Sequence, residues 1–204
     1  MKTIGLTGGI GSGKSSATEI LAEFGAAVIN ADSVGHDIYR PGTDGWKKVS
    51  DAFGSGIVAA DGSIDRKKLG AIVFADPAAL KRLNAIVHPL ISDEVKRRIA
   101  ALRASGFRLP IVVEAAILIE ANWQPLVDEV WLLVAGKAAV VQRLRAQRGV
   151  TTADIEARIA AQLDDPTRRR QADVVIENDA SLDSLRHKLH DAWMQLLKRD
   201  SVGD

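Results

Sequence analysis

The stretch that most constrains the fold reads GGIGSGKSS, spans residues 8–16, and directly follows the short apolar run KTIGLT. Its spacing fits G-x-x-x-x-G-K-[ST], which is typical of a loop that joins a strand to a helix and holds nucleotide phosphates. Glycines let backbone N–H groups point inward around phosphate oxygens, and the helix that follows adds partial positive charge. Apolar residues at helical spacing come next, so the context predicts a strand, a phosphate loop and an amphipathic helix.

The residues of this loop have separate expected tasks. Lys14 is expected to reach the β- and γ-phosphates of a nucleoside triphosphate, and the Ser15 hydroxyl to complete the shell of a Mg²⁺ ion. The remaining contacts with the phosphates are assigned to Gly11, Ser12, Gly13 and Ser16. The loop therefore predicts the donor of a reaction, and it leaves the acceptor open.

Five short runs rich in apolar residues are expected to form strands that are covered on both faces. They span residues 2–7, 26–30, 109–116, 128–135 and 172–178. Helical segments separate them, which is the pattern of a parallel sheet with helices on both sides. We therefore predict an α/β fold of the P-loop hydrolase and kinase class, with a five-stranded parallel sheet flanked by helices.

The long stretch between the second and third strands, residues 31–108, contains no good strand. Its apolar residues recur at helical spacing, so we expect a helical insertion. The pair His88-Pro89 is expected to separate two helices, since the residue before proline is pushed out of the helical region. The His88 ring could then face a pocket, although a turn histidine with a local hydrogen bond is the simpler interpretation.

Asp32 stands just past the second strand. The ends of parallel strands at one edge of such a sheet face the phosphate loop, so its carboxylate could accept a proton from an acceptor hydroxyl or help to place Mg²⁺. The alternative is an N-cap for the helix that follows. Both interpretations stay open from these residues alone.

Arginines gather in two places beyond the fourth strand. Arg143, Arg145 and Arg148 lie on or just after a basic helix, where they could close over a triphosphate and neutralise charge during transfer. A solvated basic face is the alternative. The run RRR at residues 168–170 has the same two interpretations, and there a solvated face is favoured.

Composition excludes several classes of protein. Apolar residues make up 47% of the 204 residues, which suffices for a full hydrophobic core, and there is no cysteine for a disulfide or a thiolate nucleophile. The formal net charge of +1 offers no argument for nucleic acid or membrane as a partner. No apolar run approaches the ~20 residues of a membrane span. We expect a soluble, cytoplasmic protein.

A set of segments in this order and spacing resembles the dephospho-CoA kinase family. The segments run from about residue 4 to 178 and read GLTGGIGSGKS, VINAD, RPG, DGSIDRKKLGAIVF, IVHP, QRL, QRG and ADVVIEN. The resemblance implies that ATP, with Mg²⁺, phosphorylates the ribose 3′-hydroxyl of dephospho-CoA, the last step of coenzyme A synthesis. It also implies one domain over residues 1–204. In that domain the core covers about 1–31, 107–136 and 171–204, a helical CoA-binding insertion about 32–106, and a lid about 137–170.

The resemblance also assigns roles to individual residues. Asp32 matches the base of the family, Lys14 and Ser15 match its phosphate and metal contacts, and Arg143 matches a lid arginine on the transferring phosphate. Arg148 lies near that arginine, and Asn178 near the adenine. The acceptor side is matched by Arg66, His88, Leu118 and Glu120.

Two other functions remain as alternatives. Another P-loop kinase, for a nucleoside monophosphate or a small metabolite, would share the same loop and differ in its acceptor region. A regulatory GTPase-like switch would need a guanine-reading Asn/Thr-Lys-x-Asp motif after a late strand, and the sequence there reads IENDAS. A monomer, a dimer and a trimer are all compatible with the sequence.

Overall fold

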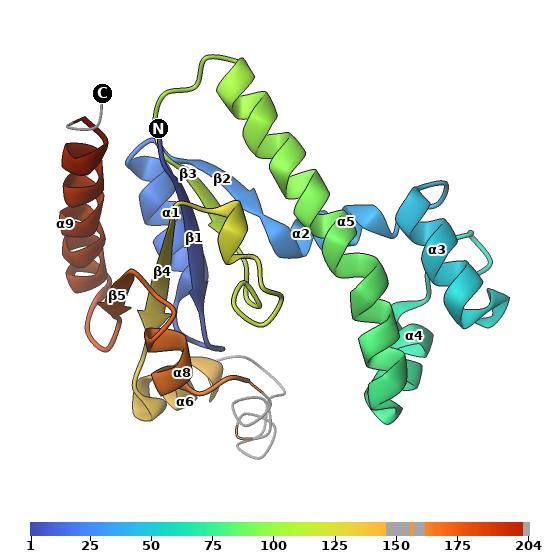
Figure 1. Ribbon diagram of the computed structural model, residues 1–204. Coiled ribbons are helices and arrows are strands. Elements are labelled where there is room, and N and C mark those ends of the chain that lie inside the picture. The colour runs from blue at the N-terminus through green and yellow to red at the C-terminus, as the bar shows by residue number, and fades with distance from the viewer. Residues whose placement is uncertain (146–155, 157–161, 202–204) are drawn as a thin grey trace. The chain divides into compact units, whose positions relative to one another are not determined.

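The computed structural model describes residues 1–145, 156 and 162–201. The chain forms two compact units (Figure 1). The first unit consists of Met1–Asn30 together with Leu102–Asp204, and the second is the continuous segment Ala31–Ala101. The phosphate loop and all five strands belong to the first unit.

The five predicted strands are confirmed, and every pairing between them is parallel. They lie in the order β2-β3-β1-β4-β5, so that β1 is the central strand (Figure 1). The strands are β1 (Thr3–Gly8), β2 (Ala27–Asn30), β3 (Ile111–Glu114), β4 (Glu129–Val134) and β5 (Val174–Glu177). The phosphate loop therefore leaves the sheet from its middle, with two strands on either side.

Two helices, α1 (Lys14–Glu23) and α9 (Leu182–Ser201), cover one face of this sheet. Strand residues alternate between faces, so Ile4 and Leu6 point into this core, whereas Gly5 lies on the other face against Leu118 and Val127. The core under α1 and α9 consists of Ile4, Leu6, Ala17, Ile20, Leu21, Val112, Trp131, Leu133, Ile176, Leu185, Leu189, Trp193 and Leu196.

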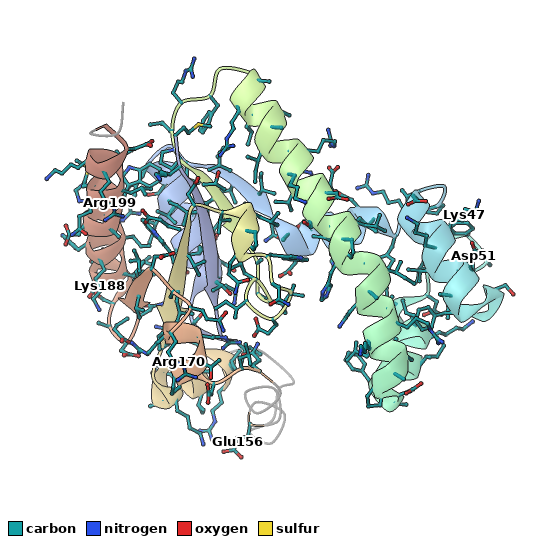
Figure 2. All side chains as sticks on the ribbon, viewed as in Figure 1. Lys47, Asp51, Glu156, Arg170, Lys188 and Arg199 are labelled. Carbon is teal, nitrogen blue, oxygen red and sulfur yellow. The ribbon has the colours of Figure 1, made fainter. Side chains whose placement is uncertain are left out.

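Polar contacts also tie α9 to the sheet. Arg199, labelled in Figure 2, donates to both carboxylate oxygens of Glu129 at the start of β4, at 3.0 and 2.9 Å. The Lys188 ammonium group donates to the carbonyl oxygen of Glu177 at the end of β5. The helix is thus held at the strands that form one edge of the sheet.

Three short elements complete the described part of the first unit. They are the 3₁₀ turn η2 (Gln124–Leu126), the helix α6 (Lys137–Arg145) after β4, and the helix α8 (Asp165–Arg169) before β5. Pro166 in the first turn of α8 and the side chain of Asp164, which accepts a hydrogen bond from Thr167 N, define where α8 begins. The predicted lid, residues 137–170, lies partly outside the described residues.

The second unit is helical, as the sequence predicts. Its elements are α2 (Ala31–Ile38), α3 (Asp44–Phe53), the 3₁₀ turn η1 (Ser55–Ile57), α4 (Arg66–Ala75) and most of α5 (Pro77–Ala104). Side-chain oxygens cap three of these helices: Thr43 accepts from Trp46 N, Asp65 from Lys67 N and Lys68 N, and Asp76 from Ala78 N.

The predicted break at His88-Pro89 is wrong, because α5 runs through Pro89 without interruption. Proline removes one hydrogen bond from a helix, but the apolar stripe of α5 continues on both sides of it. Leu83, Val87, Ile91, Val95 and Ile99 are buried at four-residue spacing. Burial of this stripe outweighs the local preference at Pro89. Within the described residues, no helix has both the length and the apolar composition of a membrane span.

Candidate active site

The phosphate loop leads into α1 through glycines with left-handed backbone conformations. Gly11 has φ 71° and Gly13 has φ 96°, a region that disfavours residues with a Cβ. Among the described residues, no side chain caps the start of α1, and its first turn contains no acidic residue. The first N–H groups of α1 are therefore available to an anion, and the helix dipole favours one there.

A cavity of about 310 Å³ lies against this helix start. The Lys14 ammonium group donates to the carbonyl oxygens of Gly8 at 2.9 Å and Gly9 at 3.4 Å, across the mouth of the loop. The cavity is lined by the predicted nucleotide-binding residues Gly11, Gly13, Lys14, Ser15 and Ser16, together with Ile10, Arg143 and Leu144. The structure thus brings together the loop residues that the sequence singles out and Arg143.

Asn178 and Arg143 hold the loop from outside. The side-chain amide of Asn178 is buried and donates to the carbonyl oxygen of Ser12 at 2.8 Å. The guanidinium of Arg143 donates to the carbonyl oxygens of Gly11 at 3.1 Å and of Asn178 at 2.7 Å. These bonds join α6 and the end of β5 to the loop. The roles assigned to Asn178 at the adenine and to Arg143 on the phosphate stay predictions.

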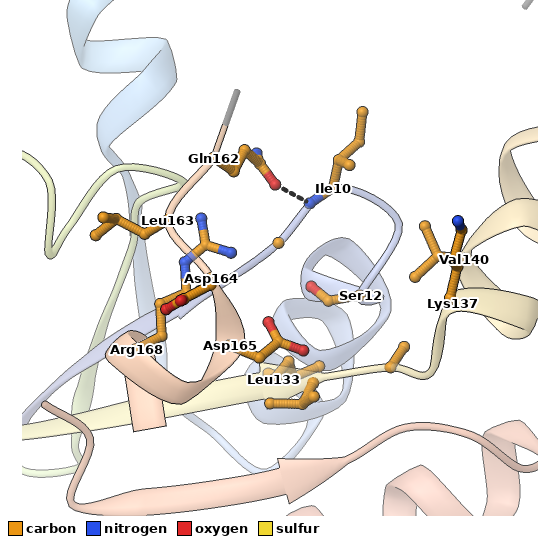
Figure 3. Close-up of a pocket in the computed structure, with 13 residues that line it drawn as sticks. Ile10, Ser12, Leu133, Lys137, Val140, Gln162, Leu163, Asp164, Asp165 and Arg168 are labelled. Atoms are coloured by element: carbon orange, nitrogen blue, oxygen red, sulfur yellow. Dashed lines mark hydrogen bonds between the residues drawn. The ribbon is translucent and has the colours of Figure 1, made fainter. Parts of the chain in front are cut away.

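A second cavity, of about 400 Å³, lies on another side of the loop (Figure 3). It is lined by Gly9, Ile10 and Ser12 of the loop, by the end of β4 and residues that follow it, and by residues 162–165 and Arg168. The side-chain oxygen of Gln162 accepts a hydrogen bond of 2.9 Å from the backbone N–H of Ile10, which joins this segment to the loop.

The favoured interpretation of residues 168–170 as a solvated basic face is wrong for Arg168. Its side chain is only 2% exposed and forms an ion pair of 2.8 Å with Glu120. Arg169 and Arg170 are exposed. Three consecutive arginines have no periodicity that could distinguish the buried member, so no signal in the sequence identifies Arg168.

Glu114 and Ser15 are two residues of the first unit whose side-chain oxygens are candidate ligands of a metal ion. Glu114 ends β3 beside β1, is 8% exposed, and accepts a hydrogen bond of 2.9 Å from the Asn30 amide at the end of β2. No cluster of three or more Asp, Glu, His or Cys side chains exists within the described residues. Mg²⁺ bound to phosphates needs only one or two protein ligands, and the exposed hydroxyl-bearing Ser15 can supply one. The residues present therefore fit Mg²⁺.

Leu118 is a core residue. Its side chain is fully buried and packs against Gly5 on the second face of the sheet. The acceptor-side role that the resemblance assigns to Leu118 stays a prediction. Its neighbour Ile117 is 38% exposed. Arg148 lies outside the described residues.

Asp32, Arg66 and His88 belong to the second unit. Asp32 is exposed in the first turn of α2, which begins at Ala31, so it is not the N-cap that was the alternative. Arg66 begins α4, with its guanidinium carbon 5.9 Å from the centre of the Tyr39 ring. His88 is half-buried in α5, and this burial lowers the pKa of its imidazole below the ordinary value. The ring is therefore mostly neutral at neutral pH.

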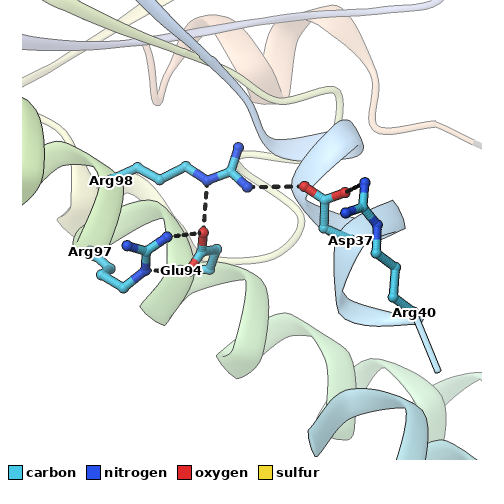
Figure 4. A network of polar contacts seen from close by, with 5 residues as sticks. All are labelled: Asp37, Arg40, Glu94, Arg97 and Arg98. Carbon is cyan, nitrogen blue, oxygen red and sulfur yellow. Dashed lines mark hydrogen bonds and ion pairs between the residues drawn. The ribbon is translucent and has the colours of Figure 1, made fainter. Parts of the chain in front are cut away.

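A network of five charged side chains joins α2 to α5 within this unit (Figure 4). Arg98 donates to Glu94 at 2.8 Å and to Asp37 at 3.0 Å, and Arg97 donates twice to Glu94. Hydrogen bonds from Arg97, aided by the one from Arg98, lower the pKa of Glu94 to about 2. Asp37 also pairs with Arg40. Three of these residues, Asp37, Glu94 and Arg97, line a cavity of about 380 Å³.

Comparisons with known proteins identify relatives over nearly the whole chain. A family model described as dephospho-CoA kinase matches residues 2–184. A dephospho-CoA kinase from Geobacter sulfurreducens is 42% identical over 193 residues, which cover 95% of this chain and 98% of the relative.

Two solved structures share the fold of this chain. TT1252 from Thermus thermophilus matches with a TM-score of 0.78 and 30% identity, covering 96% of this chain and 97% of that one. A dephospho-CoA kinase from Campylobacter jejuni has the same fold, with a TM-score of 0.72 and 24% identity over 97% of this chain and 98% of its own. The match of the family model to residues 2–184 and the 42% identical relative show that the chain belongs to the dephospho-CoA kinase family.

Proposed function

We propose that this protein transfers the γ-phosphoryl group of ATP to the ribose 3′-hydroxyl of dephospho-CoA, and so releases coenzyme A and ADP in the last step of coenzyme A synthesis. The observation that carries the proposal is the match of 95% of the chain to a dephospho-CoA kinase at 42% identity. A cytoplasmic location and the absence of nucleic-acid partners stay predictions from the sequence.

The proposed reaction is a direct in-line transfer without a phosphoenzyme. The oxygen of the 3′-hydroxyl forms a bond to the γ-phosphorus, while the bond from that phosphorus to the bridging oxygen of ADP breaks. The proton of the hydroxyl passes to the carboxylate of Asp32, whose side chain is exposed. Bond formation, bond cleavage and proton transfer then balance.

The residues of the first unit hold the triphosphate for this step. Lys14 binds the β- and γ-phosphates, and the uncapped N–H groups of α1 orient them. Arg143 stabilises the conformation of the loop through its hydrogen bonds to the carbonyl oxygens of Gly11 and Asn178, and it contributes positive charge beside the loop. Mg²⁺, when bound through Ser15, neutralises charge on the phosphate oxygens. Arg66 and His88 are assigned to the acceptor, and Arg148 to the lid.

An assay of ADP release with a panel of acceptors tests the proposal. Dephospho-CoA is compared with AMP, CMP, shikimate and no acceptor, and mass spectrometry with nuclease P1 treatment locates the new phosphate at the 3′ position. We expect ADP release when dephospho-CoA is the acceptor, and none with the other acceptors or without an acceptor. Equal ADP release without any acceptor would indicate an ATPase, and preference for a nucleoside monophosphate or shikimate would indicate another kinase of the same fold.

A further inference from the structure

Arg168 is a buried cation beside the phosphate loop that the proposed mechanism does not use. It is 2% exposed, and its only ion pair among the described residues is with Glu120, which is 25% exposed. A charge is costly to bury unless it is paired and its donors are hydrogen-bonded. The position of Arg168 therefore requires an explanation beyond packing.

The pair is incompletely satisfied. Within the part of the chain that the structure describes, Arg168 Nε and the second carboxylate oxygen of Glu120, Oε2, are buried without a hydrogen-bond partner. Ser12 Oγ, which lines the same 400 Å³ cavity as Arg168, is likewise without one. A guanidinium has five N–H donors in a rigid fork suited to carboxylates and phosphates. Arg168 thus has N–H donors left for an anion besides the one that Glu120 accepts from.

The guanidinium lies against one residue of the loop. Figure 3 shows it reaching from α8 toward the loop. A Cβ built on Gly9 would lie 3.2 Å from Arg168 Nη1, so the glycine permits this approach. Lys14, the residue that reaches the β- and γ-phosphates in such loops, donates to the carbonyl oxygen of the same Gly9. Two cations therefore flank the residue at the γ-phosphate end of the loop.

Two acidic residues, Asp164 and Asp165, also line this cavity, and the charge of Arg168 is among the causes that lower the pKa of Asp164. Asp164 is engaged as the N-cap of α8, where it accepts from Thr167 N. Asp165 follows it in the first turn of α8. The nearest neighbours of the Gly9 Cβ position are the Arg168 guanidinium and the Gln162 side-chain oxygen. Among the described side chains, the Arg168 guanidinium is thus the charged group nearest to the Gly9 Cβ position.

We propose that Arg168 is a phosphate-binding residue that contacts the terminal phosphate of the nucleoside triphosphate, and that Glu120 is its positioning residue. This assignment rests on the proposed function for the presence of a triphosphate in the loop. It replaces the acceptor-side role of Glu120 with a role on the donor side. It also makes Arg168 a sensor of the γ-phosphate, since ADP lacks the group that Arg168 would contact.

Binding of two nucleotides distinguishes this role from a structural one. Calorimetric titration compares a non-hydrolysable ATP analogue with an imido β–γ bridge against ADP, both with Mg²⁺. We expect Arg168→Gln to weaken the analogue about tenfold to a hundredfold, the loss of one charge-assisted hydrogen bond, and to change ADP affinity less than about twofold. Glu120→Gln keeps the size of the side chain and is expected to produce a smaller loss of the same kind.

Arg170→Gln is the matched control, because Arg170 is exposed at the end of the same helix (Figure 2). It should leave both affinities unchanged. Equal weakening of both nucleotides by Arg168→Gln would overturn the proposal and indicate support of the loop, and so would the absence of any effect. If Arg168→Gln does not fold, Arg168→Lys is titrated with the same two nucleotides. We expect it to weaken binding of the analogue and to leave ADP affinity nearly unchanged. These titrations need no acceptor, so failure of dephospho-CoA as substrate would not affect their outcome.

Discussion

The side-chain amide of Asn178 donates a 2.8 Å hydrogen bond to the backbone carbonyl of Ser12, across 166 positions of the chain. The bond joins the end of β5 to the phosphate loop, and its donor is buried. Arg143 bridges the same two segments through Gly11 and Asn178. The loop is therefore held by side chains from two other elements as well as by its own glycines.

Gly13→Ala is expected to destabilise the protein and to abolish nucleotide binding. Gly13 has φ 96°, and an added Cβ would overlap the Asn178 amide nitrogen. Strain and overlap together should lower the free energy of unfolding by about 2–4 kcal/mol, measured by urea denaturation with nucleotide titration in parallel. Gly42→Ala is the control, because Gly42 has φ 85° but no atom of the described residues within 4 Å of its Cβ position. Gly42→Ala should lower the free energy of unfolding only through backbone strain. An equal loss in both variants would contradict a contribution from overlap with Asn178.

Asp32→Asn is expected to reduce kcat about a hundredfold or more, because a general base contributes about 10²–10⁴-fold, while the affinity for ATP is kept. Turnover with dephospho-CoA and titration with the ATP analogue give the two quantities. Asp44→Asn is a matched control, since Asp44 also lies exposed in the first turn of a helix of the same unit. Near-wild-type turnover of Asp32→Asn would refute its assignment as base.

Pro89→Ala is expected to stabilise the protein. Proline inside α5 leaves one carbonyl of the preceding turn without its helical donor, and alanine restores that N–H. We expect the free energy of unfolding to rise by about 1–3 kcal/mol, as measured by urea denaturation. Pro77→Ala serves for comparison, because proline is tolerated at the first position of this helix. If both variants gave the same change, the position inside the helix would not be the cause.

The ion pairs of Glu94 should make stability depend on acid pH. They lower the pKa of Glu94 from 4.5 to about 2. The resulting stabilisation of the folded state is complete above about pH 4.5 and is lost as the pH falls toward about 2. Since Arg97 is 68% exposed, solvent screening limits the contribution to about 1 kcal/mol. Glu94→Gln should therefore be less stable than wild type near neutral pH, and the difference in the free energy of unfolding should shrink near about pH 3.

A control for this titration is Asp93→Asn. Asp93 is 73% exposed and pairs only with Lys96 among the described ion pairs, so we expect a smaller dependence on pH. A difference between wild type and Glu94→Gln that stayed constant from neutral to acid pH would show that the carboxylate contributes through packing and not through its charge.

Much of the fold follows from local patterns in the sequence. The five strands were predictable because parallel strands of such sheets are apolar runs, and the loop because its glycines and Lys14 have a fixed spacing. The expected cover on both faces is incomplete at the edges of the sheet, where Val28 of β2 and Val175 of β5 are each 37% exposed. The continuity of α5 was not predicted, although the buried positions from Leu83 to Ile99 keep helical spacing through Pro89. There the periodic stripe was the better guide than the residue before proline.

The site was less predictable than the fold, because its contacts join residues far apart in the chain. Neither the pairing of Arg168 with Glu120 nor the bond from Asn178 to Ser12 leaves a local pattern. Leu118 illustrates the same limit. It stands in a run of apolar residues, and the sequence does not show which residues of that run are fully buried. Such assignments depend on how the strands are ordered in space, and order in the sheet differs from order in the sequence.

The interrupted first unit has a consequence for synthesis on the ribosome. The phosphate loop emerges early, but the strands that flank β1 are translated after the whole second unit, and Asn178 follows the last of them. The helical segment is contiguous and can fold while the nascent chain is still growing. The loop acquires its full set of neighbours only once β5 and Asn178 have left the exit tunnel. A truncated nascent chain would therefore not capture nucleotide, even though it already carries every residue of the motif.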